Sequence, residues 1–452
     1  MEEPDGLDLE TAEALGIAHE AAPGGEVASS VGRAPKEESI SYERLYRLWE
    51  QSNWSATQID FSVDKEHWYS KLTERQREAA LWNYAMFLVG EEAVARTLTP
   101  VLDAAPSHEQ SIFLTTQIVD EARHHVFFDR FMREVAGLGR DRESTLQEMQ
   151  PYLTWGFENV FAELDRTTEA LRKKPKDRAL LTQTVALYHL VIEGLLAIPG
   201  QHFIQRYTEK LEILPGFTEG INNVSRDESR HVAFGIKFLG DLIRSSKEAR
   251  AAAIELWDRV LPYSVGVFVP PNRDPSYAEC FNFTLEEIFA FGLRGFETKL
   301  RRLGIDPSEI RLLGSMDRDL SYEERARQTW VLINAGVIGD DRREPEVTFE
   351  AFEILFAGMA RLMDIDAARS VGGPIEWDFS DAEPWHLVVV DGHAEAKPGR
   401  AGEPGLRLEC AAADFAKIAV GRTDPRWALL KRRLKVHGHL SHRTKLPKLF
   451  PY

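Results

Sequence analysis

The sequence predicts a mainly α-helical protein in which a helical bundle is followed by a smaller α+β domain. Apolar residues recur at three- and four-residue spacing between residues 41 and 303, which is the period of amphipathic helices. Short runs of β-forming residues with turns between them begin only after residue 370. A length of 452 residues exceeds the size at which one hydrophobic core keeps growing, so two domains are expected.

The expected helices of the bundle are long and follow one another closely. They cover 74–98, 108–135, 146–171, 178–211, 221–244, 247–261 and, after a Pro-rich turn, 285–303. A joint rich in Gly, Asp and Arg at 339–345 marks the expected domain boundary. Beyond it, a helix at 348–363 precedes short strands at 375–379, 386–390, 393–396 and 406–410 and helices at 414–420 and 425–433. This order predicts an α+β domain.

The predicted division is a disordered acidic tail at 1–40, a helical bundle at 41–310, a helical linker at 311–345 and the α+β domain at 346–452. The tail lacks the basic and apolar regions of a signal peptide, and no apolar run reaches the roughly 18 residues that span a bilayer. Cys280 and Cys410 lie far apart and outside any CxxC pattern, which indicates two structural thiols in a reducing compartment. A cytoplasmic protein without a transmembrane segment is therefore expected.

Charge separates most of the chain from its last thirty residues. The net charge of −17 argues against a general affinity for the phosphates of nucleic acids. From Arg422 onward, however, many Lys and Arg residues face a single acid, Asp424. Such a run suits an anionic lipid headgroup or an acidic partner, but it is also typical of a solvated face or of a segment that docks on the chain's own acidic surface.

Two copies of the pattern Asp-Glu-x-Arg-His lie in helical segments, at 120–124 and 227–231. In each copy the Glu and the His are three residues apart, as Glu121 with His124 and as Glu228 with His231. This spacing places a carboxylate and an imidazole side by side on one helix face, where they can hold one metal ion. A single Glu-x-x-His would be weak evidence, because it often marks an exposed helix face.

Each copy is preceded by a helix that carries a further Glu. Glu91 lies 30 residues before Glu121, and Glu193 lies 35 before Glu228 in an otherwise apolar stretch. An unpaired carboxylate is costly to bury there, and a bound cation removes that cost; the alternative is a core of salt-bridged acids. Four carboxylates and two imidazoles suit iron or manganese better than structural zinc. The whole arrangement is typical of ferritin-like di-iron and di-manganese proteins.

Several neighbours of the predicted ligands are secondary candidates. Asp120 and Asp227 directly precede the ligand Glu residues and are positioned to accept the second ring N–H of the His ligands. Alternatively, each is a surface acid paired with Arg123 or Arg230. Adjacent helix positions point about 100° apart, so three other neighbours are interpreted as surface or second-layer packing. These three are Glu92, His125 and His189.

From about residue 41 to 303 the chain resembles the ribonucleotide-reductase small-subunit-like superfamily. It is most similar to the ligand-binding oxidases, in Ile59-Asp-Phe-Ser, in Gly90-Glu-Glu-Ala-Val and in a Tyr five residues before Glu193. The resemblance implies a di-iron or mixed Mn/Fe cofactor, oxygen activation and a fatty-acid-like ligand at the metals. It also implies a covalent bond between the residues at the places of Val94 and Tyr188. The alternative is that both simply pack in the core.

Two positions separate this chain from other members of that superfamily. Radical-generating reductase subunits generally place their radical Tyr four residues after the first His ligand, where this chain has Phe128. Some reductase subunits are similar to this arrangement, with Phe and a Mn/Fe site, so the reductase interpretation stays open. The N-oxygenases carry an additional His four residues before the last Glu, where this chain has Val224, so their seven-ligand chemistry is not expected.

Residues from about 346 to 452 resemble a sterol-carrier-protein-type lipid-binding domain. The likeness lies in Val389-Val-Asp-Gly, in the run from Asp414 to Gly421, and in Leu434-Lys-Val-His-Gly followed by a last amphipathic helix. Such domains enclose an apolar tunnel for acyl chains or sterols. The resemblance therefore implies that a hydrophobic substrate reaches the metal site.

These inferences predict an oxidoreductase with two transition-metal ions, Fe/Fe or Mn/Fe, that activates O2 as an oxidase or monooxygenase of a lipid-like substrate. Its expected partners are O2, a hydrophobic or fatty-acid-like ligand, an external electron donor and, as one option, a second copy of the chain. One alternative is a radical-generating small subunit of ribonucleotide reductase. Another is a non-catalytic protein that binds metal and lipid.

Overall fold

The structure, a computed structural model, describes residues 40–443 and 446–450, so the predicted acidic tail lies outside the described residues except for its last position. The chain forms two compact units. The helical unit comprises the described residues through Ser264 together with Pro270–Ile305, and the C-terminal unit comprises Val265–Val269 and the described residues from Asp306 onward. Residues 311–345, predicted as a linker, fold within the C-terminal unit and include α15 (Arg311–Ser315) and α16 (Tyr322–Asn334).

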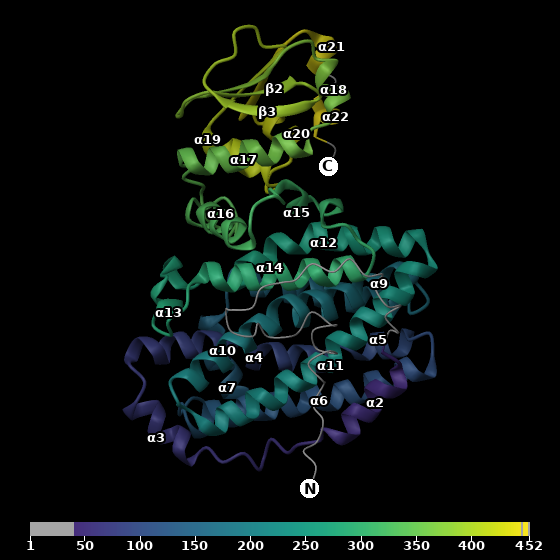
Figure 1. Ribbon diagram of the computed structural model, residues 1–452, viewed down its shortest axis with the longest axis vertical. Coiled ribbons are helices and arrows are strands. Elements are labelled where there is room, and N and C mark those ends of the chain that lie inside the picture. The colour runs from purple at the N-terminus through teal and green to yellow at the C-terminus, as the bar shows by residue number, and fades with distance from the viewer. Residues whose placement is uncertain (1–39, 444–445, 451–452) are drawn as a thin grey trace, which may run out of the picture. The chain divides into compact units, whose positions relative to one another are not determined.

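Long helices lie side by side in the helical unit and confirm the predicted bundle (Figure 1). The helices that position the site are α4 (Glu74–Thr97), α6 (His108–Glu134), α11 (Pro215–Ser245) and one continuous stretch made of α9 (Arg178–Val185), η2 (Ala186–Ala197) and α10 (Ile198–Lys210). The remaining helices of eight or more residues are α2 (Tyr42–Gln51), α3 (Ser62–Ser70), α7 (Arg142–Met149), α8 (Trp155–Lys173), α12 (Lys247–Val267) and α14 (Leu285–Arg302).

Polar caps determine where the site-bearing helices begin. Thr73 and Gln76 form a reciprocal capping box at the start of α4, and the same device starts α6. The first turn of α11 is capped from another helix, because the buried carboxylate of Asp64 on α3 accepts two of its backbone N–H groups. These come from Gly216 at 2.9 Å and Phe217 at 2.7 Å. Because the caps fix where each of these helices begins, they also fix which helical turn carries each predicted ligand.

One predicted helix is interrupted. The periodicity between 146 and 171 predicts a single helix, but α7 ends at Met149 and α8 begins at Trp155. A short 3-10 turn, η1 (Gln150–Tyr152), lies between them. Pro151 explains the break, because proline lacks an N–H group and its ring clashes with the preceding turn. The prediction of one continuous helix was wrong here.

The stretch from α9 to α10 is unusual in two ways. Among the described residues it alone, Arg178–Lys210, has the length and apolar composition that could cross a membrane, yet 89% of its most apolar window is buried inside the protein. That burial is typical of a core helix. Its central part, η2, has π-helical hydrogen bonds, which usually occur as short bulges and often at functional sites.

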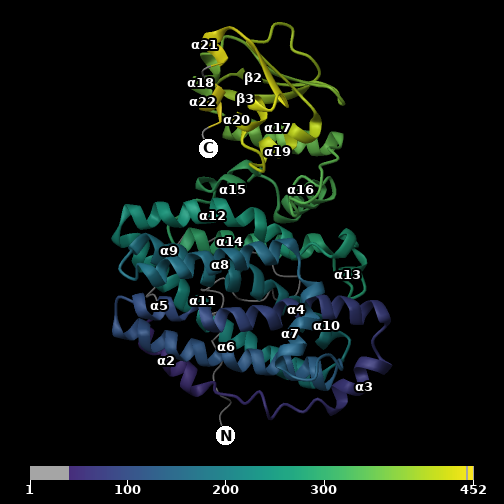
Figure 2. The same cartoon turned by 180° about the vertical axis from the view of Figure 1, so that it is seen from behind.

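The C-terminal unit is a five-stranded sheet with helices, as the α+β prediction requires (Figure 2). The strands are β1 (Ile375–Phe379), β2 (Trp385–Val390), β3 (His393–Pro398), β4 (Leu406–Cys410) and β5 (Leu434–Gly438), in the order β3-β2-β1-β4-β5. β1 pairs with β4 in parallel, and all other neighbours are antiparallel. The helices are α17 (Phe349–Leu362), α18 (Ile365–Arg369), α19 (Ala412–Ala419), α20 (Pro425–Leu430), α21 (Leu440–Arg443) and α22 (Leu446–Leu449).

Aromatic rings fill the space between α17, α19 and the sheet. Phe356 of α17 stacks on Trp385 of β2 at 5.1 Å and on Phe415 of α19 at 4.8 Å between ring centroids.

Cys280 and Cys410 are both free thiols, as predicted, and burial raises their pKa values to about 11 and about 12. Both therefore stay protonated and unreactive.

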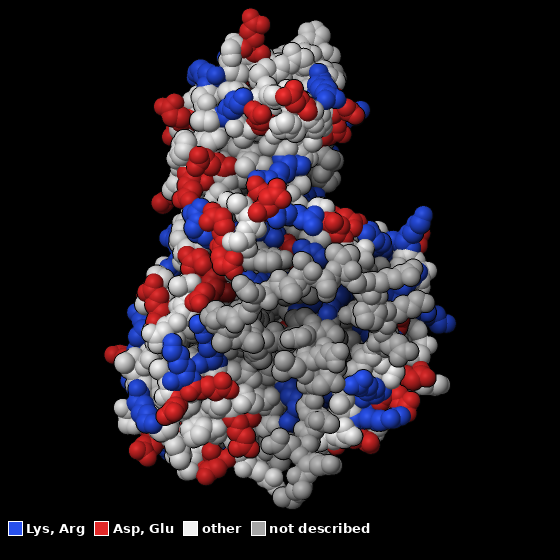
Figure 3. Space-filling view, in the orientation of Figure 1, with Lys and Arg blue, Asp and Glu red and all other residues white. Residues whose placement is uncertain are grey.

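Neither sign of charge dominates the described residues on the face drawn in Figure 3. Lys and Arg side chains alternate there with Asp and Glu side chains over the described residues of both units.

Candidate metal centre

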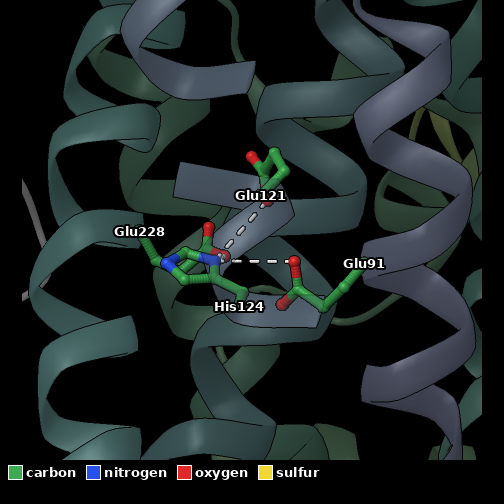
Figure 4. Close-up of side chains that lie close together, drawn as sticks. All are labelled: Glu91, Glu121, His124 and Glu228. Carbon is green, nitrogen blue, oxygen red and sulfur yellow. Dashed lines mark ion pairs between the residues drawn. The ribbon is translucent and has the colours of Figure 1, made fainter. Parts of the chain in front are cut away.

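The six predicted ligands converge from four helical segments in the interior of the helical unit. Glu91 lies on α4, Glu121 and His124 on α6, Glu193 on η2, and Glu228 and His231 on α11. None of them is more than 5% exposed. The ligand atoms of Glu91, Glu121, His124 and Glu228 all lie within 4.8 Å of one another, as do those of Glu121, Glu193 and His231. Figure 4 shows the first group, with the three carboxylates around the His124 ring.

Two of the carboxylates face both histidines. Oε2 of Glu121 lies 3.6 Å from Nδ1 of His124, and its Oε1 lies 3.3 Å from Nδ1 of His231. Glu228 repeats this arrangement, with Oε1 at 3.6 Å from Nδ1 of His124 and Oε2 at 3.6 Å from Nδ1 of His231. Each of these carboxylates can therefore offer one oxygen to each of two neighbouring cations.

The other two carboxylates are divided between the histidines. Oε2 of Glu91 lies 3.5 Å from Nδ1 of His124, and Oε1 of Glu193 lies 3.5 Å from Nδ1 of His231. Five ligand atoms are buried without a hydrogen-bond partner among the described residues. They are Nδ1 of both histidines and Oε2 of Glu91, Glu193 and Glu228. Unpartnered buried polar atoms are costly, so this group fits cations bound between the carboxylates and the Nδ1 atoms.

The pKa shifts of the four carboxyl groups also suit bound cations. Burial raises the pKa of Glu91 and of Glu193 well above the ordinary value, and it also raises the pKa of Glu228. Burial acts in the same direction on Glu121, but His231 and His124 outweigh it and hold the pKa of Glu121 well below its ordinary value. Divalent cations would allow all four carboxylates to ionise together.

Asp120 and Asp227 hold the far sides of the two imidazole rings. Nε2 of His124 donates to Oδ2 of Asp227 at 3.2 Å, and Nε2 of His231 donates to Oδ2 of Asp120 at 3.2 Å. Each aspartate therefore orients the histidine of the other motif. Arg230 pairs with both aspartates, at 2.6 Å from Asp227 and 3.2 Å from Asp120. The pairing with an arginine is therefore present, but both aspartates are buried, so their interpretation as surface acids was wrong. With Nε2 engaged, Nδ1 is the nitrogen left for a metal.

Two tryptophans that the sequence did not predict as part of the site donate hydrogen bonds to these two aspartates. Nε1 of Trp49 on α2 donates to Oδ1 of Asp120 at 2.9 Å. Nε1 of Trp54, just after α2, donates to Oδ2 of Asp227 at 2.7 Å. These partners are 71 and 173 residues apart in the sequence, so no local spacing connects them. The segment around α2 thus supports both aspartates from outside the four ligand-bearing segments.

The buried side-chain amide of Gln117, which the sequence did not predict as part of the site, contacts two of the ligand carboxylates. Nε2 of Gln117 donates to Oε1 of Glu193 at 2.7 Å and to Oε1 of Glu121 at 3.3 Å. Its carbonyl oxygen accepts from Nε2 of His189 at 3.2 Å. Burial lowers the pKa of His189 to about 3, so this ring is neutral. Gln117 could have been found, because it lies four residues before Glu121 on the same helix face.

His189 packs in the layer behind the ligands, in agreement with its interpretation as second-layer packing, and the π-helical segment η2 turns its neighbour Tyr188 toward the site. Residues five apart in an α-helix point about 140° apart, whereas the i to i+5 bonds of a π-helix bring them close to one line. Tyr188 and Glu193 can then both face the site, and the Tyr188 hydroxyl donates to Oε1 of Glu121 at 2.7 Å. Gly235 permits the close approach of this segment, since a Cβ there would lie 2.1 Å from Cβ of His189.

Val94 and Phe128 lie in the core of the helical unit. Val94 is buried on α4, three residues after Glu91, and its covalent bond to Tyr188 stays a prediction. Phe128 is fully buried and stacks on Phe87 at 5.3 Å between ring centroids. The position of a reductase radical Tyr is therefore filled by a ring without a hydroxyl group.

The fold and this buried group define a ferritin-like helical protein with carboxylate and imidazole groups able to bind metal. Residues 38–260 match the family described as ribonucleotide reductase, small chain, and residues 360–451 match the SCP-2 sterol transfer family. The chain therefore carries a domain of the reductase small-chain family followed by an SCP-2 domain, which confirms both resemblances.

Solved structures similar to this chain are R2-like ligand-binding oxidases. One, a variant with an aerobically reconstituted Mn/Fe cofactor, is 22% identical with a TM-score of 0.52, and the match covers 59% of this chain and 95% of that one. Another, from Sulfolobus acidocaldarius, is 26% identical with a TM-score of 0.50, over 60% of this chain and 93% of that one. At 22% identity, the first of these two matches shows a shared fold and nothing more.

Proposed function

We propose that this chain is an oxidoreductase with two metal ions, an oxidase or monooxygenase that uses O2 to oxidise a hydrophobic, lipid-like substrate. The observation that carries the proposal is that two buried carboxylates, Glu121 and Glu228, each face both histidines. Carboxylate and imidazole donors of this kind suit an Fe/Fe or Mn/Fe pair. The similar oxidases with Mn/Fe cofactors support the same class.

The two ions would share two carboxylates. Glu91, Glu121, His124 and Glu228 would hold one ion, and Glu121, Glu193, Glu228 and His231 would hold the other. When bound in reduced form, such a pair supplies electrons for the reduction of O2. Asp227 and Asp120 keep the histidine Nε2 atoms protonated, so that each Nδ1 faces the carboxylates.

The chain itself contributes orientation, water exclusion and a proton. Gln117 fixes the carboxylate of Glu193 through its amide. Burial raises the pKa of Tyr188 well above its ordinary value, so its hydroxyl stays protonated and holds a proton at Oε1 of Glu121. Hydroxylation would place one oxygen atom of O2 in a substrate C–H bond and release the other as water, with the two remaining electrons and two protons coming from an external donor.

The proposed substrate class rests on the C-terminal unit and on the surroundings of the histidines. A domain of the SCP-2 sterol transfer family supports a lipid ligand for the chain. Aromatic rings border the centre, with Phe113 at 6.4 Å from His231 and Trp54 at 6.3 Å from His124 between ring centroids. These rings supply apolar surface beside the polar groups of the centre, as an apolar ligand requires.

The reductase alternative is favoured by one observation, the match of residues 38–260 to the small-chain family. Phe128 argues against it, because a radical Tyr at that place would need a hydroxyl group. The non-catalytic alternative predicts that the metal-loaded protein consumes no O2 in the presence of lipid.

The test is to incubate metal-loaded protein with a reductant, O2 and a cell lipid extract, and to compare the lipids by mass spectrometry. We expect O2 consumption together with a lipid that gains oxygen or loses hydrogen. Glu228→Ala removes a shared carboxylate and should abolish the product, whereas Lys71→Ala, on the exposed surface, should retain it. Unchanged lipids with both metals and with several reductants would contradict the oxidase proposal and favour the non-catalytic alternative.

A further inference from the structure

The short helix α20 in the C-terminal unit carries an unusual set of exposed apolar side chains. Trp427 is 59% exposed and Leu430 is 72% exposed, with Leu429 at 40%. Eight large hydrophobic side chains are this exposed among the described residues, and three of them belong to this six-residue helix. Scattered single residues of this type are ordinary, but a cluster of them marks an interaction surface.

Hydrogen bonds hold the backbone under these side chains at both ends of the helix. The side chain of Asp424 caps α20 by accepting the N–H of Arg426 at 2.7 Å. Ala428 is buried and accepts the N–H of Arg433 through its carbonyl oxygen at 2.9 Å. Arg432 has a φ of 59°, a left-handed conformation that turns the chain into β5. The exposed side chains are therefore presented by a fixed turn of helix.

Cations without acidic partners surround the apolar cluster. Arg426, Lys431 and Arg432 are exposed and form no ion pair with any described residue. Asp424 is engaged as the cap of α20, Asp414 lies 3.5 Å from Arg433, and Glu409 contacts two basic side chains of β5 at 3.2 and 3.6 Å. The α20 surface, which we define as Arg426, Trp427, Leu429, Leu430, Lys431 and Arg432, therefore carries excess positive charge on a chain whose net charge is −17.

We propose that the α20 surface docks on an anionic lipid membrane. Trp is favoured at the boundary between headgroups and acyl chains, and exposed Leu side chains beside it can enter the acyl region. The three unpaired cations would meet the negative lipid headgroups. Apolar anchors combined with basic residues are the pattern of peripheral membrane binding, whereas binding to a polyanion alone would leave the exposed Trp and Leu side chains without a role.

This inference does not depend on the metal centre. It gives the SCP-2 domain a way to reach a bilayer, which is where an apolar ligand of the chain would be found. Part of the basic segment after Arg422 pairs with the chain's own acids, as Arg422 does with Asp341 at 3.0 Å. The proposal assigns the anionic lipid headgroup only to the cations of the α20 surface. Failure of the oxidase proposal would leave the membrane proposal intact, and the reverse is also true.

The experiment is flotation of the full chain with vesicles of phosphatidylcholine alone or mixed with phosphatidylglycerol. We expect binding to the mixed vesicles that weakens as salt is added. Replacing Arg426, Lys431 and Arg432 by Ala should weaken that binding on the order of a hundredfold. The double variant Trp427→Ser and Leu430→Ser should weaken it by at least about tenfold, because the apolar contribution is lost.

Matched controls come from exposed residues of the helical unit. Val63→Ser removes an exposed apolar side chain, and the double variant Lys65→Ala and Lys71→Ala removes exposed cations. These controls should bind vesicles as the parent protein does. Equal binding to neutral and mixed vesicles would overturn the proposal. Binding that survives Trp427→Ser and Leu430→Ser but is lost with the cations would also overturn it, in favour of contact with a polyanion.

Discussion

The two halves of the candidate metal centre use the same donors but differ in how the protein supports them. In the first half, Glu91 lies on the regular helix α4, and no amide among the described residues donates to its carboxylate; Oε2 is unpartnered in both Glu91 and Glu193. In the second half, Glu193 lies on the π-helical η2 and accepts a hydrogen bond from Gln117 at 2.7 Å. The protein therefore orients the carboxylate of the second half in advance, while that of the first half depends on the ion it binds.

This difference predicts that the two positions bind their metal ions with unequal affinity. A ligand that is already oriented loses less conformational freedom when an ion binds, so its position should bind more tightly. We expect the position beside His124 to lose its ion first during treatment with a chelator, and the position beside His231 to keep its ion longer.

The largest effect is expected from loss of a shared carboxylate. Glu121→Ala should remove both ions, because Glu121 faces His124 and His231 alike. Glu91→Ala should remove only the ion beside His124. Metal analysis after gel filtration measures both outcomes. Retention of one ion by Glu121→Ala, or loss of both by Glu91→Ala, would show that the carboxylates are not shared in this way.

Breaking the crossed aspartate contacts should give the next largest effect. Asp227→Asn should weaken the position beside His124 by about 10- to 100-fold, because it alters the partner of Nε2. Asp120→Asn should weaken the position beside His231 instead. Chelator competition measures both, with the exposed Asp103→Asn as a control that should change nothing. If each variant weakened the histidine of its own motif, the crossed arrangement would be wrong.

Gln117→Leu tests the comparison of the two halves itself. The substitution removes the amide that holds Glu193, so affinity at the position beside His231 should fall by about tenfold. The two positions should then release their ions at similar rates. A thermal unfolding curve checks that the buried replacement still folds. Unequal release that persists unchanged in this variant would show that the amide is not the cause of the difference.

Tyr188→Phe should have the smallest effect on metal content. It removes one buried hydrogen bond to Glu121, which should cost about 1 kcal/mol of folding stability and leave both ions bound. Its main use is to test the predicted bond to Val94. A linked peptide, lighter by two hydrogens than its separate parts, should be found in the parent protein and be absent from the variant. Detection of only unlinked peptides in the parent protein, after exposure to O2, would contradict the crosslink.

The parts of the centre that follow from local spacing were predictable. A Glu and a His three residues apart share a helix face whatever the rest of the chain does, and this places Glu121 with His124 and Glu228 with His231. The contacts of Trp49 and Trp54 were not predictable, because they depend on how a distant segment packs. Helical spacing could not show that Tyr188 and Glu193 face the same site, because a helical wheel assumes 3.6 residues per turn, which η2 does not have; only the family resemblance named Tyr188.

The fold shows the same division between local and distant causes. The start and end of β1 and of β4 follow from their own residues and from the turns beside them, and both strands were predicted with their observed bounds. β5 was not recognised as a strand, because α19 and α20 separate it from its partner β4 and no tight turn announces the pairing, whereas the equally peripheral β3 follows β2 through a short turn. Pro151 was visible in the sequence as a helix breaker but was given too little weight against the apolar periodicity around it.

The most direct test of the account is anomalous X-ray diffraction from crystals of protein grown with both iron and manganese. We predict two peaks inside the helical unit, one beside Nδ1 of His124 and the other beside Nδ1 of His231, with Glu121 and Glu228 between them. A single peak in metal-replete crystals, or peaks on the Nε2 side of the rings where Asp227 and Asp120 lie, would contradict it.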